Sequence, residues 1–278
     1  MTRRPEVAVV APLTGPRAAW GAVLLGRVER AKAEHPAAAD WHVHDEAAGV
    51  AATVVAGDYA AVVGHSDPAG GRLAAEAYEA AGLTCLLPFL RAGTAALSWA
   101  PDDESLARVI AEGAAALGAA ALATVHDEGP RWAELARRVA KEAAARGLAE
   151  VPAGGPGEAL AVLAPQERCL RLTRAAAPRG PVLIPVDCGL GSFTALAAHT
   201  AGLEVWAVHA QACAVRQADS AVTALARTLA ESPGLRGREL TEAVRANSGV
   251  LLAAGGGPLG DGWRISRPRE VCPGPVRR

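Results

Sequence analysis

Several residue types that often mark a specialised protein are scarce in this sequence. Only 4% of its 278 residues are aromatic (six Trp, two Tyr and two Phe), and the sequence has a single Met. No apolar run approaches the roughly 20 residues that a transmembrane helix needs. The formal net charge is only −1, so no strong field attracts the chain to nucleic acid or to an anionic membrane. These absences argue against nucleic acid as a partner and against membrane insertion.

Cysteine is also scarce, and its spacing shows no pattern. The five cysteines form no Cys-x-x-Cys pair and are odd in number, whereas disulfide frameworks and zinc sites need regular, close spacing. We therefore expect reduced thiols. The sequence contains no Gly-x-Ser-x-Gly motif, no phosphate-binding P-loop and no complete dinucleotide-binding fingerprint. No cofactor and no metal ion are expected, and nothing compels an enzymatic function.

The N-terminus shows no evident secretory signal. Such a signal has a positively charged start, roughly 7–15 apolar residues and a small-residue cleavage site. Here the apolar run 7–13 is strand-like and leads directly into the turn Thr14-Gly15-Pro16. We expect the protein to be cytoplasmic, and exported only if an upstream signal precedes this sequence.

What is present is an alternation of β-branched runs with Ala-rich segments of helical length. At 51% hydrophobic, the chain can bury a core, and it is long enough for two domains. Strands that alternate with helices predict βαβ units and parallel sheets covered on both faces, and the pattern restarts after Leu97–Asp103. The sequence therefore predicts an α/β protein with two doubly wound parallel-sheet lobes. The expected strands are 7–10, 41–44, 60–63, 84–87, 121–125, 160–163, 181–186, 205–209 and 262–265, and the expected helices are 18–33, 47–55, 69–81, 105–118, 132–146, 167–177, 193–201, 218–230 and 238–246.

The strongest candidate site follows the strand 60–63, in the segment Gly64-His65-Ser66-Asp67-Pro68. Ligands of open α/β sheets bind beyond the carboxyl ends of the strands. Here Ser66 or Asp67 can cap the next helix, and Pro68 suits its first position. Free N–H groups and the Ser66 hydroxyl would then form a seat for a carboxylate or a phosphate. A capped helix with nothing bound is the alternative, and local signals favour it.

Two further polar segments are weaker candidates for a functional site. Asp187 follows the strand 181–186, where its carboxylate would pair with a ligand ammonium or cap its own turn. His42-Val-His44-Asp45-Glu46 resembles a metal site, because alternate strand residues share a face. With no third ligand at a recognisable spacing, a polar strand end is the favoured interpretation.

Four segments together resemble a known family. They are Val7-Ala-Val-Val-Ala-Pro-Leu-Thr-Gly-Pro16 with Trp20-Gly21, Tyr59-Ala-Ala-Val-Val-Gly-His-Ser66, Tyr78-Glu-Ala-Ala-Gly-Leu-Thr84, and Ala123-Thr-Val-His-Asp127 with its following helix. They are similar to the branched-chain amino-acid-binding proteins of ABC transporters, which have the type I periplasmic-binding-protein fold. The similarity extends thinly over most of the chain and is weak beyond Gln211.

The resemblance implies two lobes, joined by three crossovers that form a hinge and closing on a ligand between them. The first lobe would comprise residues 1–100 with about 212–248, and the second 101–211 with about 249–267. The Pro/Arg-rich tail 268–278 is expected to be loose.

The resemblance also assigns roles in ligand binding. Ser66 and the loop through Asp67 to Ala69 match the segment that binds the ligand carboxylate, and Phe89–Arg91 match the next loop. Trp20 lies where an aromatic ring often covers the ligand. Asp187 matches the residue that holds the ammonium, and Arg131 lies where a Tyr is usual.

Three functions remain open. The first is a cytoplasmic sensor or sequestering protein for an amino-acid-like ligand, with a protein partner or a homodimer possible in addition. The second is a transporter-associated solute-binding protein whose export signal lies upstream of this sequence. The third is an enzyme derived from the binding fold, using His65, Asp67, Asp187 or Cys188 in a closed cleft. We favour the first.

The two arginines depart from the family pattern and lead to a prediction. Arg91 and Arg131 would favour a ligand with an additional carboxylate or phosphate over leucine or valine. A buried charge-assisted hydrogen bond contributes about 1.5–3 kcal/mol, so Arg91→Ala should weaken binding of such a ligand roughly tenfold to a hundredfold. Calorimetry on both proteins measures this, and equal affinities would show that Arg91 is a surface residue.

Overall fold

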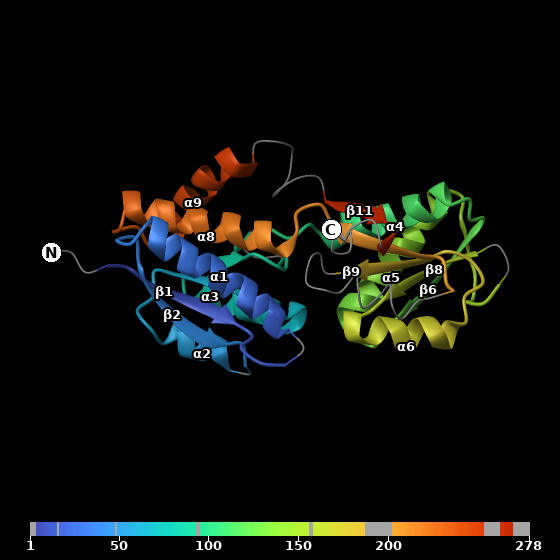
Figure 1. Ribbon diagram of the computed structural model, residues 1–278, viewed down its shortest axis with the longest axis horizontal. Coiled ribbons are helices and arrows are strands. Elements are labelled where there is room, and N and C mark those ends of the chain that lie inside the picture. The colour runs from blue at the N-terminus through green and yellow to red at the C-terminus, as the bar shows by residue number, and fades with distance from the viewer. Residues whose placement is uncertain are drawn as a thin grey trace, which may run out of the picture. The chain divides into compact units, whose positions relative to one another are not determined.

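The computed structural model describes residues 4–15, 17–47, 49–92, 95–155, 158–186, 202–252 and 262–268. The chain forms two compact units, Met1–Pro101 with Ala212–Asp261 and Asp102–Gln211 with Gly262–Arg278, so it passes from one unit to the other three times. Each unit is a mainly parallel sheet with helices packed on it (Figure 1). The predicted fold class, two parallel-sheet α/β lobes, is confirmed.

The sheet of the first unit has the order β2-β1-β3-β4-β5, and all its pairs are parallel. The residues of β3 and β4 are all buried, as are those of β1 after its first residue, because a parallel sheet is covered on both faces. The edge strand β2 is mostly exposed. The strands are β1 (Glu6–Ala11), β2 (Asp40–Asp45), β3 (Ala61–Gly64), β4 (Thr84–Leu87) and β5 (Leu97–Ser98).

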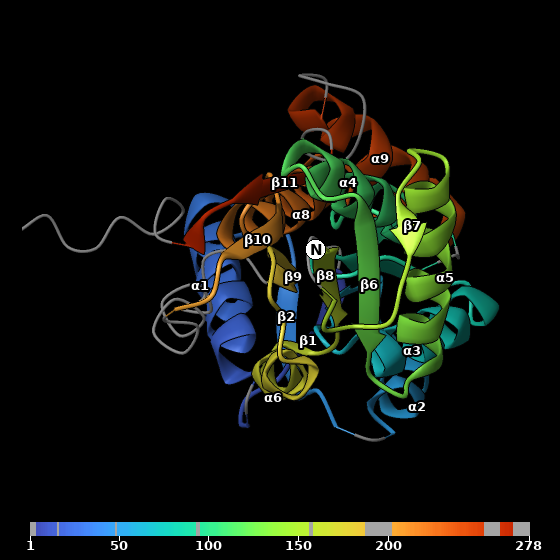
Figure 2. The same cartoon turned by 90° about the vertical axis from the view of Figure 1, so that its right-hand side faces the viewer.

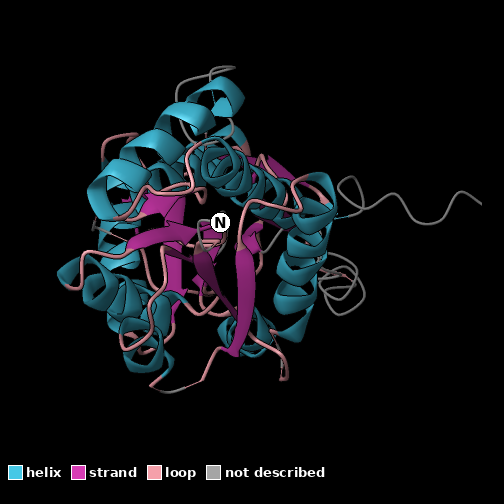
Figure 3. Cartoon of the chain, turned by 90° about the vertical axis from the view of Figure 1, so that its left-hand side faces the viewer, coloured by secondary structure: helices cyan, strands magenta, loops and turns pink. Residues whose placement is uncertain are grey.

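Helices lie on both sides of these strands (Figure 3). Alternate residues of a strand point to opposite faces, so β1 serves two cores. Val7 and Val9 pack with α1 (Ala18–Glu34), α8 (Ala214–Glu231) and α9 (Gly237–Leu252), while Ala8 and Val10 pack with α2 (Val50–Val55) and α3 (Pro68–Ala80). None of the described helices has both the length and the apolar content that crossing a membrane requires.

The described strands of the second unit form a sheet in the order β11-β10-β9-β8-β6-β7 (Figure 2), in which β10 and β11 are antiparallel and the other pairs are parallel. On one face, Leu106 of α4 and Leu135 of α5 pack with Leu183 of β9; α6 contacts β8 and β9. The predicted helix 193–201 and nearly all of the tail 268–278 lie outside the described residues. The elements are α4 (Asp103–Ala116), β6 (Ala121–His126), α5 (Pro130–Ala144), β7 (Ala149–Glu150), β8 (Glu158–Leu163), α6 (Gln166–Ala176), β9 (Val182–Val186), β10 (Val205–Ala210) and β11 (Trp263–Ser266).

Each sheet has one point where the strand order reverses. In the first unit the chain places β2 on one side of β1 and β3 on the other, and in the second it places β7 and β8 on either side of β6. Loops leaving adjacent strand ends diverge at such a point, and the crevice between them is where open α/β sheets bind ligands. The fold therefore directs attention to the loops after β1 and β3, and to those after β6 and β8.

Two glycines of α1 provide a matched test of how closely the β1–α1 turn is packed. A Cβ added at buried Gly21 would overlap the backbone carbonyl oxygen of Pro12, whereas one added at exposed Gly26 would meet nothing within 4 Å. We expect Gly21→Ala to lower the free energy of unfolding by about 1–3 kcal/mol through overpacking. Gly26→Ala should instead raise it by roughly 0.5–1 kcal/mol, because alanine loses less backbone entropy in a helix. Urea unfolding of both variants measures the contrast, and equal effects would contradict this close approach.

Candidate functional site

The loop after β3 has an unusual backbone. Gly64 has a φ of +149°, and a Cβ there would overlap the Val10 carbonyl oxygen of β1. The next residue, His65, has a φ of 64°, in the left-handed region that few residues with side chains adopt. Its N–H donates to the same Val10 oxygen at 3.1 Å. Glycine at position 64 is therefore required for β3 to end against β1 and for the chain to turn there.

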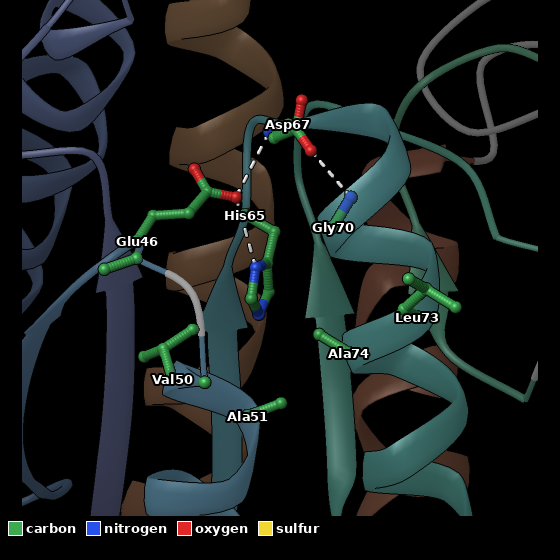
Figure 4. Close-up of a pocket in the computed structure, with 10 residues that line it drawn as sticks. Glu46, Val50, Ala51, His65, Asp67, Gly70, Leu73 and Ala74 are labelled. Carbon is green, nitrogen blue, oxygen red and sulfur yellow. Dashed lines mark hydrogen bonds and ion pairs between the residues drawn. The ribbon is translucent and has the colours of Figure 1, made fainter. Parts of the chain in front are cut away.

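The carboxylate of Glu46 lies against this loop. Glu46 follows β2 directly, and its own N–H donates to the carbonyl oxygen of Ala11 at 3.0 Å. Its carboxylate oxygens accept the Ser66 hydroxyl at 2.7 Å and the Ser66 N–H at 2.9 and 3.0 Å. They also accept the Asp67 N–H at 3.1 Å (Figure 4). Only 9% of the Glu46 side chain is exposed. A carboxylate from the chain itself thus occupies the position where the sequence predicts that a ligand carboxylate binds.

A buried histidine extends this network. His65 Nδ1 lies 3.2 Å from Glu46 Oε1, and its Nε2 lies 3.0 Å from the Tyr78 hydroxyl in α3. An ionised carboxylate only accepts hydrogen bonds, so Nδ1 carries the proton. Burial raises the pKa of Tyr78, so its hydroxyl stays protonated and can donate to Nε2. In the hydrogen-bond series Tyr78–His65–Glu46, each donor is therefore matched to an acceptor.

The hydrogen bonds keep Glu46 ionised. Burial by itself would raise its pKa, but the donors His65, Ser66 and Asp67 outweigh burial and lower the pKa to about 2. At neutral pH a negative charge is therefore present at this carboxyl edge.

Asp67 acts as the N-cap of α3. Its side chain accepts the Gly70 N–H at 2.6 Å, and Pro68 follows at the first helical position, so of the two capping alternatives the structure shows Asp67. Ser66 is buried, with 4% exposure, and Ala69 lies exposed in the first turn. Next to the cap, between α2 and α3, lies a cavity of roughly 460 Å³ lined by Glu46, Ala47, Gly49, Val50, Ala51, His65, Asp67, Gly70, Leu73 and Ala74 (Figure 4).

The first turn of α1 and the loop after β4 contribute an aromatic pair. The rings of Trp20 and Phe89 meet edge to face, with centroids 4.8 Å apart. Close by in the chain, Arg17 donates from its guanidinium to the Ser66 carbonyl oxygen at 2.7 Å, which ties the β1–α1 turn to the β3–α3 loop. Arg91 is exposed, and its carbonyl oxygen accepts the Nε of Arg72. The first unit therefore brings Trp20, Ser66 and Phe89 to one edge of its sheet.

In the second unit, two arginines near the corresponding edge are paired with carboxylates. Arg131 donates to both oxygens of Asp103, at 2.8 and 3.1 Å, and its guanidinium stacks 4.6 Å from the Trp132 ring centroid. Arg168 binds Asp127 at 2.7 and 3.0 Å and lowers the pKa of that carboxyl. The sequence predicts that Arg131 attracts an anionic group of the ligand, but in the structure Asp103 balances its positive charge.

Asp187 and Cys188 lie outside the described residues. The ligand-binding roles of Trp20, Ser66, Asp67, Ala69, Phe89, Arg91, Arg131 and Asp187 stay predictions. Of the residues considered as a metal site, His44 binds the Tyr59 hydroxyl at 2.9 Å, and in the described parts of the chain no three His, Cys, Asp or Glu side chains are grouped to hold one ion.

Sequence reasoning missed the roles of Glu46 and Arg17. The signal for Glu46 was available, because it follows a strand at the carboxyl edge, as Ser66 does. At this strand end the sequence favours a polar strand end over a metal site, and neither interpretation gives Glu46 a partner in the Ser66 loop. Arg17 gave no signal, since an arginine in a surface turn is usually solvated.

Comparisons with known proteins give the fold. No protein-family model and no curated protein sequence matches the chain. Among solved structures, the leucine-binding protein LivK of Thermotoga maritima matches with a TM-score of 0.71 and 15% identity, covering 87% of each chain. An ABC transporter substrate-binding protein of Desulfitobacterium hafniense in complex with Leu matches with 0.66 and 16%, covering 93% of this chain and 92% of its own. The chain has the type I periplasmic-binding-protein fold.

Solved structures of this fold hold more than one kind of ligand. An R. palustris solute-binding protein in complex with 4-hydroxybenzoate matches with a TM-score of 0.61 and 12% identity, covering 87% of this chain and 84% of its own. That ligand has a carboxylate and no ammonium group. At these identities the likeness establishes the fold alone, so the ligand has to be argued from this chain's own residues.

Replacing Glu46 tests the buried network through its pH dependence. A carboxyl whose pKa is lowered from 4.5 to about 2 stabilises the folded state fully above its unfolded pKa, and this stabilisation is lost as the pH falls towards 2. Glu46→Gln should lower the free energy of unfolding by about 1.5–3 kcal/mol at neutral pH, and by less at about pH 3. Urea unfolding at both pH values measures the difference. The control Glu76→Gln, on the exposed face of α3, should change little at either pH.

Proposed function

We propose that this chain binds a small, amino-acid-like solute and acts as a cytoplasmic sensor or sequestering protein. The observation that carries the proposal is the Trp20–Phe89 ring pair beside the β3–α3 loop, at the point where the strand order of the first sheet reverses. Trp20 is buried, with 9% exposure, and supports the partly buried Phe89 ring, which is the one that can offer apolar area to a solute. At such a crevice, nearby backbone and polar groups fix the orientation of a ligand. The fold supports the proposal, because the matching structures include proteins that hold leucine and isoleucine.

A transporter-associated solute-binding protein is the second candidate, and the same comparisons favour it. The two differ in where the protein resides and in what it contacts. Fractionation of cells that express the gene in its natural context separates them, because a transporter-associated protein is found outside the cytoplasm. Closure of the two lobes on the ligand, which the resemblance implies, stays a prediction that small-angle scattering with and without ligand measures.

An anionic group on the ligand remains part of the proposal. We keep Arg91 and Arg131 as the groups that would attract an additional carboxylate or phosphate. Arg131 is ion-paired with Asp103 and Arg91 is exposed, so we expect the lower end of the effect, about tenfold, for Arg91→Ala. The Arg91→Ala titration described above therefore also tests this preference.

The aromatic pair gives a direct test. Native mass spectrometry of gently purified protein identifies a carried solute, and calorimetry with that solute gives its affinity. Phe89→Ala should weaken binding about tenfold, since an aromatic contact contributes about 0.5–1.5 kcal/mol beyond its buried area. Trp41→Leu is the matched control, because Trp41 lies near the amino end of β2, away from the crevice, and should bind the solute as the unchanged protein does. Equal losses in both variants would contradict a role for the Trp20–Phe89 pair.

A further inference from the structure

The loop after β3 offers four hydrogen-bond donors to one carboxylate, and that carboxylate belongs to the chain. The donors are the Ser66 N–H, the Ser66 hydroxyl, the Asp67 N–H and His65 Nδ1. All four converge on the two oxygens of Glu46. Below, this group of donors is called the anion seat.

We propose that Glu46 is a built-in occupant of the anion seat and that it determines specificity by excluding ligands whose carboxylate would bind at Ser66. The inference rests on the proposed function and deepens it. The solute then presents a neutral or cationic group to this part of the first unit, and any carboxylate that it carries is bound elsewhere. Glu46 acts here through the seat, and it need not touch the solute.

The burial of the donors supports exclusion. His65 and Ser66 are exposed by 2% and 4%, and Glu46 covers them from the side of β2. A ligand carboxylate could reach these donors only after Glu46 leaves. Two carboxylates cannot share the seat, since the donors bind a single pair of oxygens and the two negative charges repel each other.

The backbone contacts of Glu46 keep its carboxylate in the anion seat. Its N–H is bound to the Ala11 carbonyl oxygen, and the preceding residue, Asp45, pairs with Ala11 in the β1–β2 ladder. Asp45 also accepts the Leu13 N–H at 2.9 Å. The backbone of Glu46 is therefore fixed within reach of the seat, and its carboxylate competes with any dissolved carboxylate at a high local concentration.

Small carboxylates test the seat without knowledge of the natural ligand. In Glu46→Ala the four donors lose their acceptor, and acetate or formate should fill the vacated space. We expect saturable shifts of the Ser66 and Asp67 amide resonances in ¹⁵N spectra of the full chain. We also expect acetate to restore about half of the melting-temperature loss, since a ligand that binds only the folded state stabilises it. Chloride at equal ionic strength should do neither.

Two matched proteins sharpen the result. Glu46→Gln keeps the space filled while removing the charge, so acetate should cause no saturable shift there. The unchanged protein should likewise show none, with acetate or with leucine, at Ser66 and Asp67. This last titration needs no variant, so the proposal stays testable even if Glu46→Ala does not fold.

The outcomes are distinct. Saturable shifts at Ser66 and Asp67 in the unchanged protein would show that a dissolved carboxylate displaces Glu46, and would overturn the proposal. Acetate shifts of equal size in Glu46→Ala and Glu46→Gln, or none in a folded Glu46→Ala, would overturn it as well. A failure of the proposed function has a different signature: no solute is carried or bound, while acetate still binds Glu46→Ala.

Discussion

The close approach of β3 to β1 at Gly64 governs the geometry of the candidate site. Because no side chain intervenes, the His65 N–H bonds the Val10 carbonyl oxygen, and the chain turns through a left-handed residue. The following N–H groups, of Ser66 and Asp67, then face the end of β2 across β1, where Glu46 is located. The Asp67 cap and the start of α3 follow from the same turn. A single close backbone contact thus places the donors and the helix that closes one side of the cavity, while the pairing of β2 with β1 places their acceptor, Glu46.

The buried charge of Glu46 stabilises the folded state only while the hydrogen-bond donors around it are in place. A carboxylate removed from water without partners is costly, whereas one that accepts several hydrogen bonds retains its ionised form. Losing one donor leaves the others bonded, but losing the carboxylate leaves four buried donors without an acceptor, at about 1–3 kcal/mol for each group that water does not reach. The network also joins β2, the β3–α3 loop and α3, so it couples the edge strand to the cap of the helix.

The sequence predicted the parallel α/β architecture because strand and helix periodicities differ and the buried strands are almost continuously apolar. It did not predict β5 and β7, which have two residues each and are set by pairing with a neighbour rather than by their own pattern. It identified the Ser66 loop from its capping residues, which are local signals. It missed Glu46 as the partner of that loop, because a contact between residues 20 apart depends on the strand order, and β2 pairs with β1 only in the folded sheet. The pairing of Arg131 with Asp103 is similarly non-local, at a separation of 28 residues.

A carboxylate from the chain itself changes which ligands can bind at the Ser66 loop without changing the fold. A dissolved carboxylate at its own concentration must compete with a tethered one, whose effective concentration is on the order of millimolar or higher. If both were present 4 Å apart, they would repel by about 4 kcal/mol at an effective dielectric constant of about 20. Discrimination built from such a repulsive element rejects the wrong ligand without adding any contact to the right one. Neither Trp20 nor Phe89 takes part in this network, so the proposal leaves their packing unchanged. Under the proposal, one residue at the end of an edge strand sets the ligand class independently of the fold, which this chain shares with the leucine-binding protein LivK.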